Sequence, residues 1–131
     1  MECDAIYIDK MKVKIEINNR TFVIDAERID GIAPMDTLIS ALSACTIISI
    51  STILKRMQVN FEKLEVHVKG EQYPDPPRTF KTIELIYKVK GNVNQDNLKR
   101  AIELTFEKYS PSAVMLKKAG VDLRYSFKIE Q

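Results

Sequence analysis

The stretch that decides the fold is "APMDTLISALSACTIISISTILKRM", residues 33–57. Pro34 suits the first turn of a helix, where its missing N–H needs no partner. Asp36 suits the same turn because a carboxylate there faces the positive end of the helix dipole, and Lys55 and Arg56 suit the negative end. The segment therefore predicts a helix that begins at Pro34 and ends near residue 57.

This expected helix carries no charge over the eighteen residues between Asp36 and Lys55. Such a run reaches the lower limit for a membrane span, but seven of its residues are Ser or Thr and no aromatic residue flanks it. We therefore expect a buried helix and no membrane association. Because a helix without a charged face has no side adapted to water, it needs cover beyond one sheet of its own chain, which predicts a homodimer.

Around this helix, apolar and polar residues alternate as they do in half-buried strands. The alternation predicts strands over residues 11–18, 21–25, 61–73, 80–91 and 121–129, the first two joined by a tight turn at Asn18 and Asn19. A second helix is expected from about Leu98, interrupted at Pro111 and ending at Gly120. The expected order is ββ–α–ββ–α–β, an α+β domain over residues 1–131 with antiparallel sheets.

Composition excludes several classes of function. The chain has 131 residues and a net charge of +2, from 20 basic and 18 acidic residues, which gives no electrostatic case for binding nucleic acid. Two cysteines, Cys3 and Cys45, are too few for a disulfide framework and lack metal-ligand spacing. We expect no metal and no cofactor. The N-terminus shows no signal pattern, so a cytoplasmic location is expected.

Cys45 lies near the middle of the expected helix and has two interpretations. A free cysteine is often a small buried hydrophobic residue. A reactive thiol needs a lowered pKa, and because mid-helix placement offers little help from the dipole, a nearby cation would be required. The candidates on loops are Arg20, Arg28 and Arg78. The residues alone leave both interpretations open.

Three motifs together resemble a known family. "APMDTLISALSACTIISISTILKRM" resembles the cysteine helix of the OsmC/Ohr family (osmotically inducible protein C and organic hydroperoxide resistance protein), in a branch with a Pro-Met-acid helix start. "PPRTFKTIELIYKVKG" (76–91) resembles its central hairpin, and "RAIELTFEKYSPSAVML" (100–116) resembles its second motif, normally Lys-Tyr-Cys-x-Val-Ser. The resemblance covers residues 12–129 and implies an OsmC-like fold, in which central helices pack between two sheets of an intertwined homodimer.

The resemblance also implies a chemistry. The best-known members are thiol peroxidases that reduce organic hydroperoxides, and Cys45 matches their attacking cysteine by position. In those members the resulting sulfenic acid condenses with a second cysteine, and a dithiol reopens the disulfide. Here Ser110 stands at the position of the second cysteine. A hydroxyl cannot form a disulfide, so an active Cys45 would need an external thiol reductant or Cys3.

A second departure concerns the helix start. The peroxidases place a Glu directly after the helix-starting Pro, where this chain has Met35, with Asp36 one residue later. Nine residues of helix place Asp36 on the side opposite Cys45, so a dipole role for Asp36 outranks a catalytic one. Ser110 likewise has a structural alternative, as a helix cap or break before Pro111.

Two functions follow. One is a thiol-dependent peroxidase acting on small organic hydroperoxides through Cys45. The other is a non-catalytic, stress-related dimer that binds an apolar ligand at the subunit interface. Several apolar side chains could line a pocket for either ligand or simply belong to the core: Met35, Met57, Met115, Phe106 and Tyr109.

Overall fold

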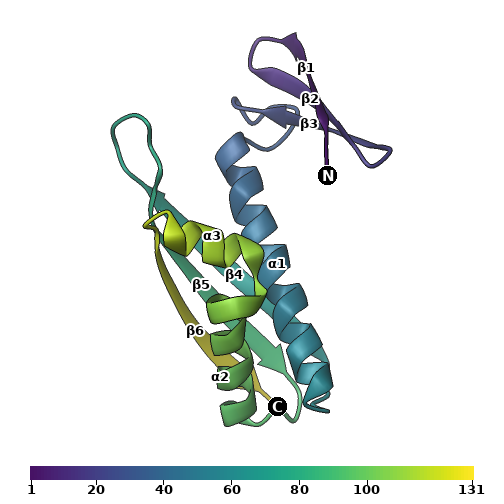
Figure 1. Cartoon of the computed structure of the whole chain (residues 1–131), viewed down its shortest axis with the longest axis vertical. Coiled ribbons are helices and arrows are strands. Elements are labelled where there is room, and N and C mark those ends of the chain that lie inside the picture. Colours follow the sequence, from purple (N-terminus) through teal and green to yellow (C-terminus); the bar gives the residue numbers. More distant parts are fainter. The chain divides into compact units, whose positions relative to one another are not determined.

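The computed structural model describes all residues from Met1 to Gln131. The chain divides into two compact units, residues 1–40 and residues 41–131, and the long helix runs through both. Figure 1 shows the order of the elements along the chain. The elements are β1 (Asp4–Asp9), β2 (Lys12–Ile17), β3 (Arg20–Asp25), α1 (Pro34–Arg56), β4 (Lys63–Gln72), β5 (Phe80–Lys90), α2 (Gln95–Leu104), the π-helical turn η1 (Thr105–Tyr109), α3 (Pro111–Lys118) and β6 (Asp122–Glu130).

The first unit contains a three-stranded antiparallel sheet in the order β1-β2-β3. Asn18 and Asn19 both have positive φ values, 50° and 60°, which confirms the predicted tight turn between β2 and β3. Strand β1 was not predicted, because it adds a strand where we expected only an N-terminal extension. Its register with β2 shifts between Tyr7 and Asp9, and all its residues are exposed.

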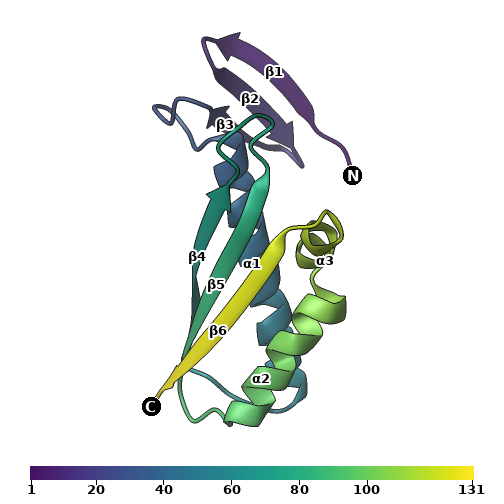
Figure 2. The same ribbon diagram turned by 90° about the vertical axis from the view of Figure 1, so that its left-hand side faces the viewer.

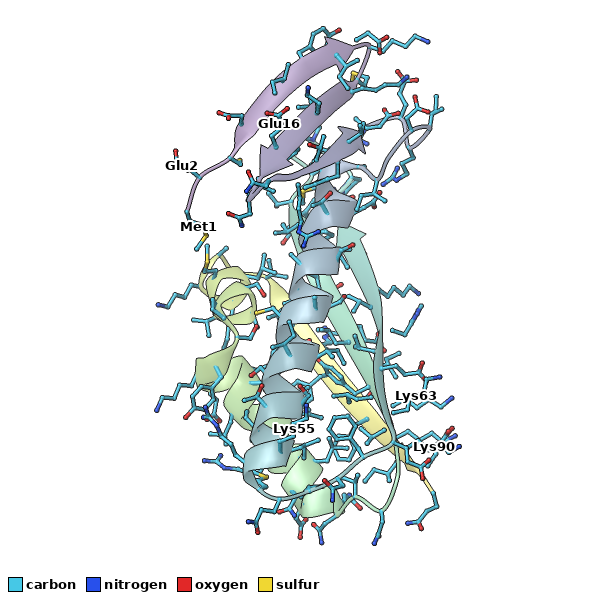
Figure 3. All side chains as sticks on the ribbon, turned by 90° about the vertical axis from the view of Figure 1, so that its right-hand side faces the viewer. Met1, Glu2, Glu16, Lys55, Lys63 and Lys90 are labelled. Carbon is cyan, nitrogen blue, oxygen red and sulfur yellow. The ribbon has the colours of Figure 1, made fainter.

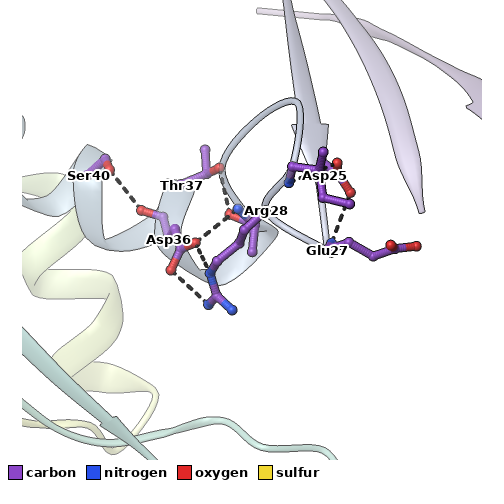
Figure 4. A network of polar contacts seen from close by, with 8 residues as sticks. Asp25, Glu27, Arg28, Asp36, Thr37 and Ser40 are labelled. Atoms are coloured by element: carbon purple, nitrogen blue, oxygen red, sulfur yellow. Dashed lines mark hydrogen bonds and ion pairs between the residues drawn. The ribbon is translucent and has the colours of Figure 1, made fainter. Parts of the chain in front are cut away.

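The start of α1 is tied to the loop after β3 by a polar network, drawn in Figure 4. The backbone N–H of Ala33 donates to the Asp36 carboxylate at 3.0 Å, which satisfies one of the donors that a helix start leaves free. Arg28 donates to both oxygens of the same carboxylate, at 2.7 and 3.1 Å. These contacts support the expected role of Asp36, which is to stabilise the first turn of α1.

Behind this network, Asp25 ends β3 with a fully buried side chain. Its carboxylate accepts hydrogen bonds from the backbone N–H groups of Glu27, Ile29 and Asp30. These donors fix the loop between β3 and α1. The Asp30 N–H is the main cause of a lowered Asp25 pKa, and burial opposes it.

The second unit is built on the sheet β4-β5-β6. Strand β5 alternates as predicted, with Ile83, Leu85, Tyr87 and Val89 fully buried. The helical segments of this unit lie on the same side of the sheet (Figure 2). Figure 3 shows Lys63 and Lys90, paired across β4 and β5, among the outward-facing side chains. The core therefore lies between this sheet and the helices.

One detail of the prediction is wrong. Strand β6 pairs with β5 in parallel, in register from Thr82 with Asp122 to Lys90 with Glu130, so the second sheet is mixed rather than antiparallel. The parallel pairing is possible because α2, η1 and α3 form a crossover long enough to return the chain to the same end of the sheet. The α+β class itself is confirmed.

The predicted break at Pro111 contains a π-helical turn that was not expected. Between α2 and α3 the helix widens into a π turn, closed by a 2.9 Å hydrogen bond from the Ser110 N–H to the Thr105 carbonyl, five residues back. Ser110 then starts α3, its hydroxyl accepting from the Ala113 N–H at 3.3 Å, with Pro111 next. The predicted capping role of Ser110 is therefore present.

Helix α1 is long and apolar enough to cross a membrane by length and composition, with a mean hydropathy of 1.9. Its fully or nearly fully buried positions recur at helical spacing: Leu42, Thr46, Ile50, Ile53 and Leu54. This face packs in the core of the second unit. The absence of membrane association stays a prediction.

Candidate functional site

The candidate site lies within residues 41–131, where α1 meets the start of α3. Cys45 on α1 and Ser110 at the start of α3 come together although sixty-five residues separate them, and the Ser110 hydroxyl donates a hydrogen bond of 3.0 Å to the Cys45 sulfur. Ser112 lies beside them, its hydroxyl 3.4 Å from that of Ser110. The two positions singled out by the resemblance are thus in direct contact.

The π turn η1 holds Ser110 in this place. Thr105, at the start of the turn, is fully buried, and its hydroxyl lies 3.0 Å from that of Ser49 on α1. The same Thr105 hydroxyl donates to the Ala101 carbonyl at 2.9 Å, so the Ser49 hydroxyl is the donor between the two. This polar pair joins α1 to the turn one helical turn beyond Cys45.

The surroundings of Cys45 favour its thiolate. Burial acts to raise the pKa of the Cys45 thiol, but hydrogen bonds from the Ser110 hydroxyl, the Ser112 hydroxyl and the Ser112 backbone N–H outweigh it, so the pKa is lower than that of an ordinary thiol. Such bonds favour the charged form because they are stronger to a thiolate than to a thiol. The side chain is half-buried and free of any disulfide.

This stabilisation differs from the expected one. A nearby cation was expected to lower the Cys45 pKa, but none of the candidates Arg20, Arg28 and Arg78 is among the groups that act on it. Arg28 is engaged with Asp36 in the first unit. The missed signal is Ser112: with Ser110 it forms a Ser-Pro-Ser start to α3, and the first N–H groups of a helix are free to bind an anion.

Tyr87 lies in the core beneath α1. Its side chain is fully buried, and its hydroxyl has no hydrogen bond of good geometry. Burial raises the pKa of Tyr87 far above its usual range, the nearby Thr46 hydroxyl acts to lower it, and a negative charge on Cys45 acts to raise it by a smaller amount. Tyr87 therefore stays neutral and supplies no charge to the site.

An open groove of about 320 Å³ leads away from the thiol. Its lining is mainly apolar and comprises Cys45, Ile48, Ser49, Thr52, Ile53, Arg56, Tyr109 and Pro111. Of the side chains expected at a pocket, only Tyr109 takes part. Phe106 is buried and stacks on Tyr125 with 4.9 Å between ring centres, whereas Met115 is exposed.

Comparison with known proteins identifies the family to which the chain belongs. The profile of the family described as OsmC-like protein matches residues 25–126, which include all of α1, η1 and α3. The chain belongs to the OsmC-like protein family.

Individual proteins resemble this chain in sequence or in fold. Protein YhfA of Escherichia coli strain K12 is 32% identical over 98 residues, which are 74% of this chain and 72% of that protein. An OsmC-like protein from Mycoplasma pneumoniae shares the fold with a TM-score of 0.89 at 15% identity, over 99% of this chain and 96% of that one. The organic hydroperoxide resistance protein OhrB of Bacillus subtilis gives a TM-score of 0.70 at 13% identity, over 98% of both chains.

Proposed function

We propose that this OsmC-like protein is a thiol-dependent peroxidase that reduces organic hydroperoxides through Cys45. The observation that carries the proposal is the 3.0 Å hydrogen bond from the Ser110 hydroxyl to the Cys45 sulfur, in a setting that lowers the thiol pKa and opens onto an apolar groove. A lowered pKa supplies thiolate, which is the nucleophile, at neutral pH.

The chemistry needs no second protein thiol in its first step. The Cys45 thiolate attacks the outer oxygen of ROOH, so an S–O bond forms, the O–O bond breaks, and the alkoxide leaves and takes a proton from water. The products are the Cys45 sulfenic acid and the alcohol. Ser110 and Ser112 then remain as hydrogen-bond partners of the oxidised sulfur.

The second step requires an external thiol. A free thiol R′SH attacks the sulfenic sulfur and releases water, which leaves a mixed disulfide, and a second R′SH releases Cys45 as R′SSR′ forms. The half-buried sulfur beside an open groove supports direct access by a small thiol. We propose the external route over Cys3, an exposed residue that belongs to the other unit.

We also propose that the chain acts as a cytoplasmic homodimer. Support for the dimer comes from apolar side chains that each unit leaves exposed. On the first unit these are Ile6, Tyr7, Ile8, Met11 and Phe22, and on α1 Ile48 is 64% exposed. Sedimentation at micromolar concentration tests this proposal, and a stable monomer would contradict it.

The decisive experiment is to expose the protein to cumene hydroperoxide and to trap sulfenic acid with dimedone. Mass spectrometry is expected to locate the adduct on Cys45, and dithiothreitol is expected to support turnover that is lost in Cys45→Ser. Peroxide consumption that is unchanged in Cys45→Ser would contradict the proposal.

The groove also favours a second candidate, a non-catalytic protein that binds an apolar ligand. In that case Cys45 reacts with peroxide no faster than free cysteine does, and an apolar ligand raises the melting temperature. The dimedone experiment therefore separates the two functions.

A further inference from the structure

A second hollow lies within residues 41–131, at the end of the unit where α1 finishes and α2 begins (Figure 1). Its volume is about 520 Å³, larger than that of the groove beside Cys45. Helix α1 continues for about 16 Å beyond Cys45 before it ends at Arg56, so the hollow is remote from the thiol. None of its lining residues belongs to the surface proposed for the dimer.

Backbone contacts hold both walls of this hollow in place. Gln58, with a φ of 61°, and Val59 close the end of α1 with the two hydrogen bonds of a Schellman motif, at 3.0 and 2.9 Å. The Glu62 N–H donates to the Lys90 carbonyl at 2.8 Å and joins this segment to the end of β5. At Gly91 the two segments touch, since an added Cβ would lie 3.2 Å from the Glu62 nitrogen. The hollow is therefore preformed.

Carboxamide side chains dominate the lining of the hollow. Five of its seven residues are Asn or Gln, and none is charged. Four of the six asparagines in the chain gather here, from two segments that lie on either side of the β4–β5 hairpin. Turn formation within one segment does not explain such a gathering. The five carboxamides are Gln58, Asn60, Asn92, Asn94 and Asn97.

Only one of these five side chains has a partner within the chain. The Asn94 side-chain oxygen caps α2 and accepts from the Asp96 and Asn97 N–H groups at 2.8 and 3.2 Å. Because the cap takes up these N–H groups, they are not available to an anion. The other four carboxamide side chains form no hydrogen bond within the chain. Their donors and acceptors are free for a ligand.

The chemistry of the lining selects a neutral ligand that is rich in hydroxyl groups. Each carboxamide offers two donor hydrogens and an acceptor oxygen, and each hydroxyl group both donates and accepts. The two remaining lining residues are Val59 and the buried Val93, which leave little apolar surface for an aromatic or aliphatic ligand. The volume lies within the range of small-molecule sites, about 300–1,000 Å³.

We propose that this hollow binds a small neutral saccharide, whose neighbouring hydroxyl groups form hydrogen bonds with the side-chain amides of Asn60, Asn92 and Asn97. The site is independent of the peroxidase function, because it shares no lining residue with the groove beside Cys45. Hydrogen bonds to the ligand replace hydrogen bonds to water, so the net gain from each is small and a Kd on the order of 1 mM is expected.

The test is a titration of the isotopically labelled full chain with sucrose, an uncharged saccharide with a single anomeric form, followed by NMR of the side-chain NH₂ groups. The signals of Asn60, Asn92 and Asn97 are expected to shift together along one saturating curve. Asn18 and Asn19, at the turn between β2 and β3, provide the internal control, and their signals are expected to stay in place.

The double variant Asn92→Ala with Asn97→Ala is expected to bind sucrose about tenfold more weakly, the effect of two lost hydrogen bonds. Neither side chain bonds within the chain, so the fold is retained, as circular dichroism checks. Gln95→Ala is the matched control, because Gln95 is an exposed carboxamide of the same segment that does not line the hollow. Its Kd is expected to equal that of the wild type.

Three results would overturn the inference. The first is a shift that grows linearly with sucrose and never saturates, and the second is an equal Kd for the double variant and the wild type. The third is saturation by N-methylacetamide without saturation by sucrose, which would assign the hollow to a peptide backbone instead.

Discussion

The Ser110 hydroxyl spans the gap between two helices: it accepts the Ala113 N–H at the start of α3 and donates to the Cys45 sulfur on α1. One side chain therefore both caps a helix and acts to lower the pKa of the Cys45 thiol. These two roles separate experimentally, because one changes stability and the other changes reactivity.

Replacing Ser110 by Ala is expected to raise the Cys45 pKa, because the hydrogen bond that most favours the thiolate is lost. The pH profile of Cys45 alkylation by iodoacetamide then moves to higher pH, and the free energy of unfolding falls by about 1 kcal/mol through the lost cap. Ser126→Ala, at an exposed position on β6, serves as the control and is expected to change neither quantity. An unmoved alkylation profile in Ser110→Ala would show that Ser110 does not act on the thiol.

The lowered Cys45 pKa also predicts how stability depends on pH. The thiol is more acidic in the folded state than in the unfolded state, so its stabilisation is present above the unfolded pKa and is lost as pH falls through the folded pKa. The free energy of unfolding of the wild type, relative to Cys45→Ser, is expected to rise with pH up to the ordinary thiol value of 9.0. Urea unfolding at several pH values measures it, and a difference that falls with pH would contradict the lowered pKa.

Replacing Ser110 by Cys is expected to allow a disulfide with Cys45, at the position that the resemblance assigns to a second cysteine. The 3.0 Å contact between Ser110 and Cys45 places a new sulfur close enough to bond after a small closure. Closing a loop of sixty-five residues stabilises the oxidised protein by up to about 4 kcal/mol in the chain-entropy model.

The measurement uses a Cys3→Ser background, so that only two thiols remain. Treatment with one equivalent of peroxide is expected to remove both free thiols of Ser110→Cys without a dimedone adduct. Ser126→Cys is the control, in which Cys45 still reacts with dimedone. Persistence of two free thiols after oxidation of Ser110→Cys would show that the contact is too loose for a bond.

Asp25 predicts acid sensitivity of the first unit. Hydrogen bonds from Asp30, Glu27 and Ile29 hold its pKa below 3.8, so the stabilisation is present above that value and is lost as pH falls through the lowered pKa. Asp25→Asn cannot accept all three donors, and a Tm lower by several degrees at neutral pH is expected, with less further loss in acid. Asp4→Asn, at an exposed position in β1, is the comparison in thermal melts followed by circular dichroism.

The contacts of Asp36 predict that it stabilises the start of α1 and does not act in catalysis. Asp36→Ala removes the acceptor for the Ala33 N–H and the partner of Arg28, and it is expected to cost up to about 1 kcal/mol because the pair is largely exposed. The alkylation rate of Cys45 is expected to stay the same. A slower rate in Asp36→Ala, with the fold intact by circular dichroism, would return Asp36 to the catalytic candidates.

The elements that the sequence predicted well are those with local signals. Helix α1 begins at Pro34 as expected, and β5 buries the alternate residues that its pattern marked, because both features depend on neighbours along the chain. Strand β1 was missed because it has no buried face to create an alternating pattern. The parallel pairing of β6 depends on the path of the intervening helices, which alternation within the strand cannot report.

In the candidate site, too, features with a local sequence signal were predicted and features that depend on the fold were not. Cys45 and Ser110 were identified through motifs, and their contact was an open question until the fold brought α1 and α3 together. Ser112 and Arg56 were not singled out as site residues, since a serine near a helix start and a cation near a helix end are both common for local reasons. Only the three-dimensional arrangement places Ser112 beside the sulfur and Arg56 in the lining of the groove.

The parallel pairing of β6 with β5 also determines when the second unit can be completed during synthesis. The β4–β5 hairpin forms from neighbouring residues, but Thr82 of β5 pairs with Asp122 of β6, which is forty residues further along the chain. Until the ribosome has delivered β6, one edge of β5 has no partner, and an unpaired edge invites pairing with other chains. A nascent chain halted before β6 therefore exposes an unpaired strand edge, which favours aggregation and makes this form a target for chaperones.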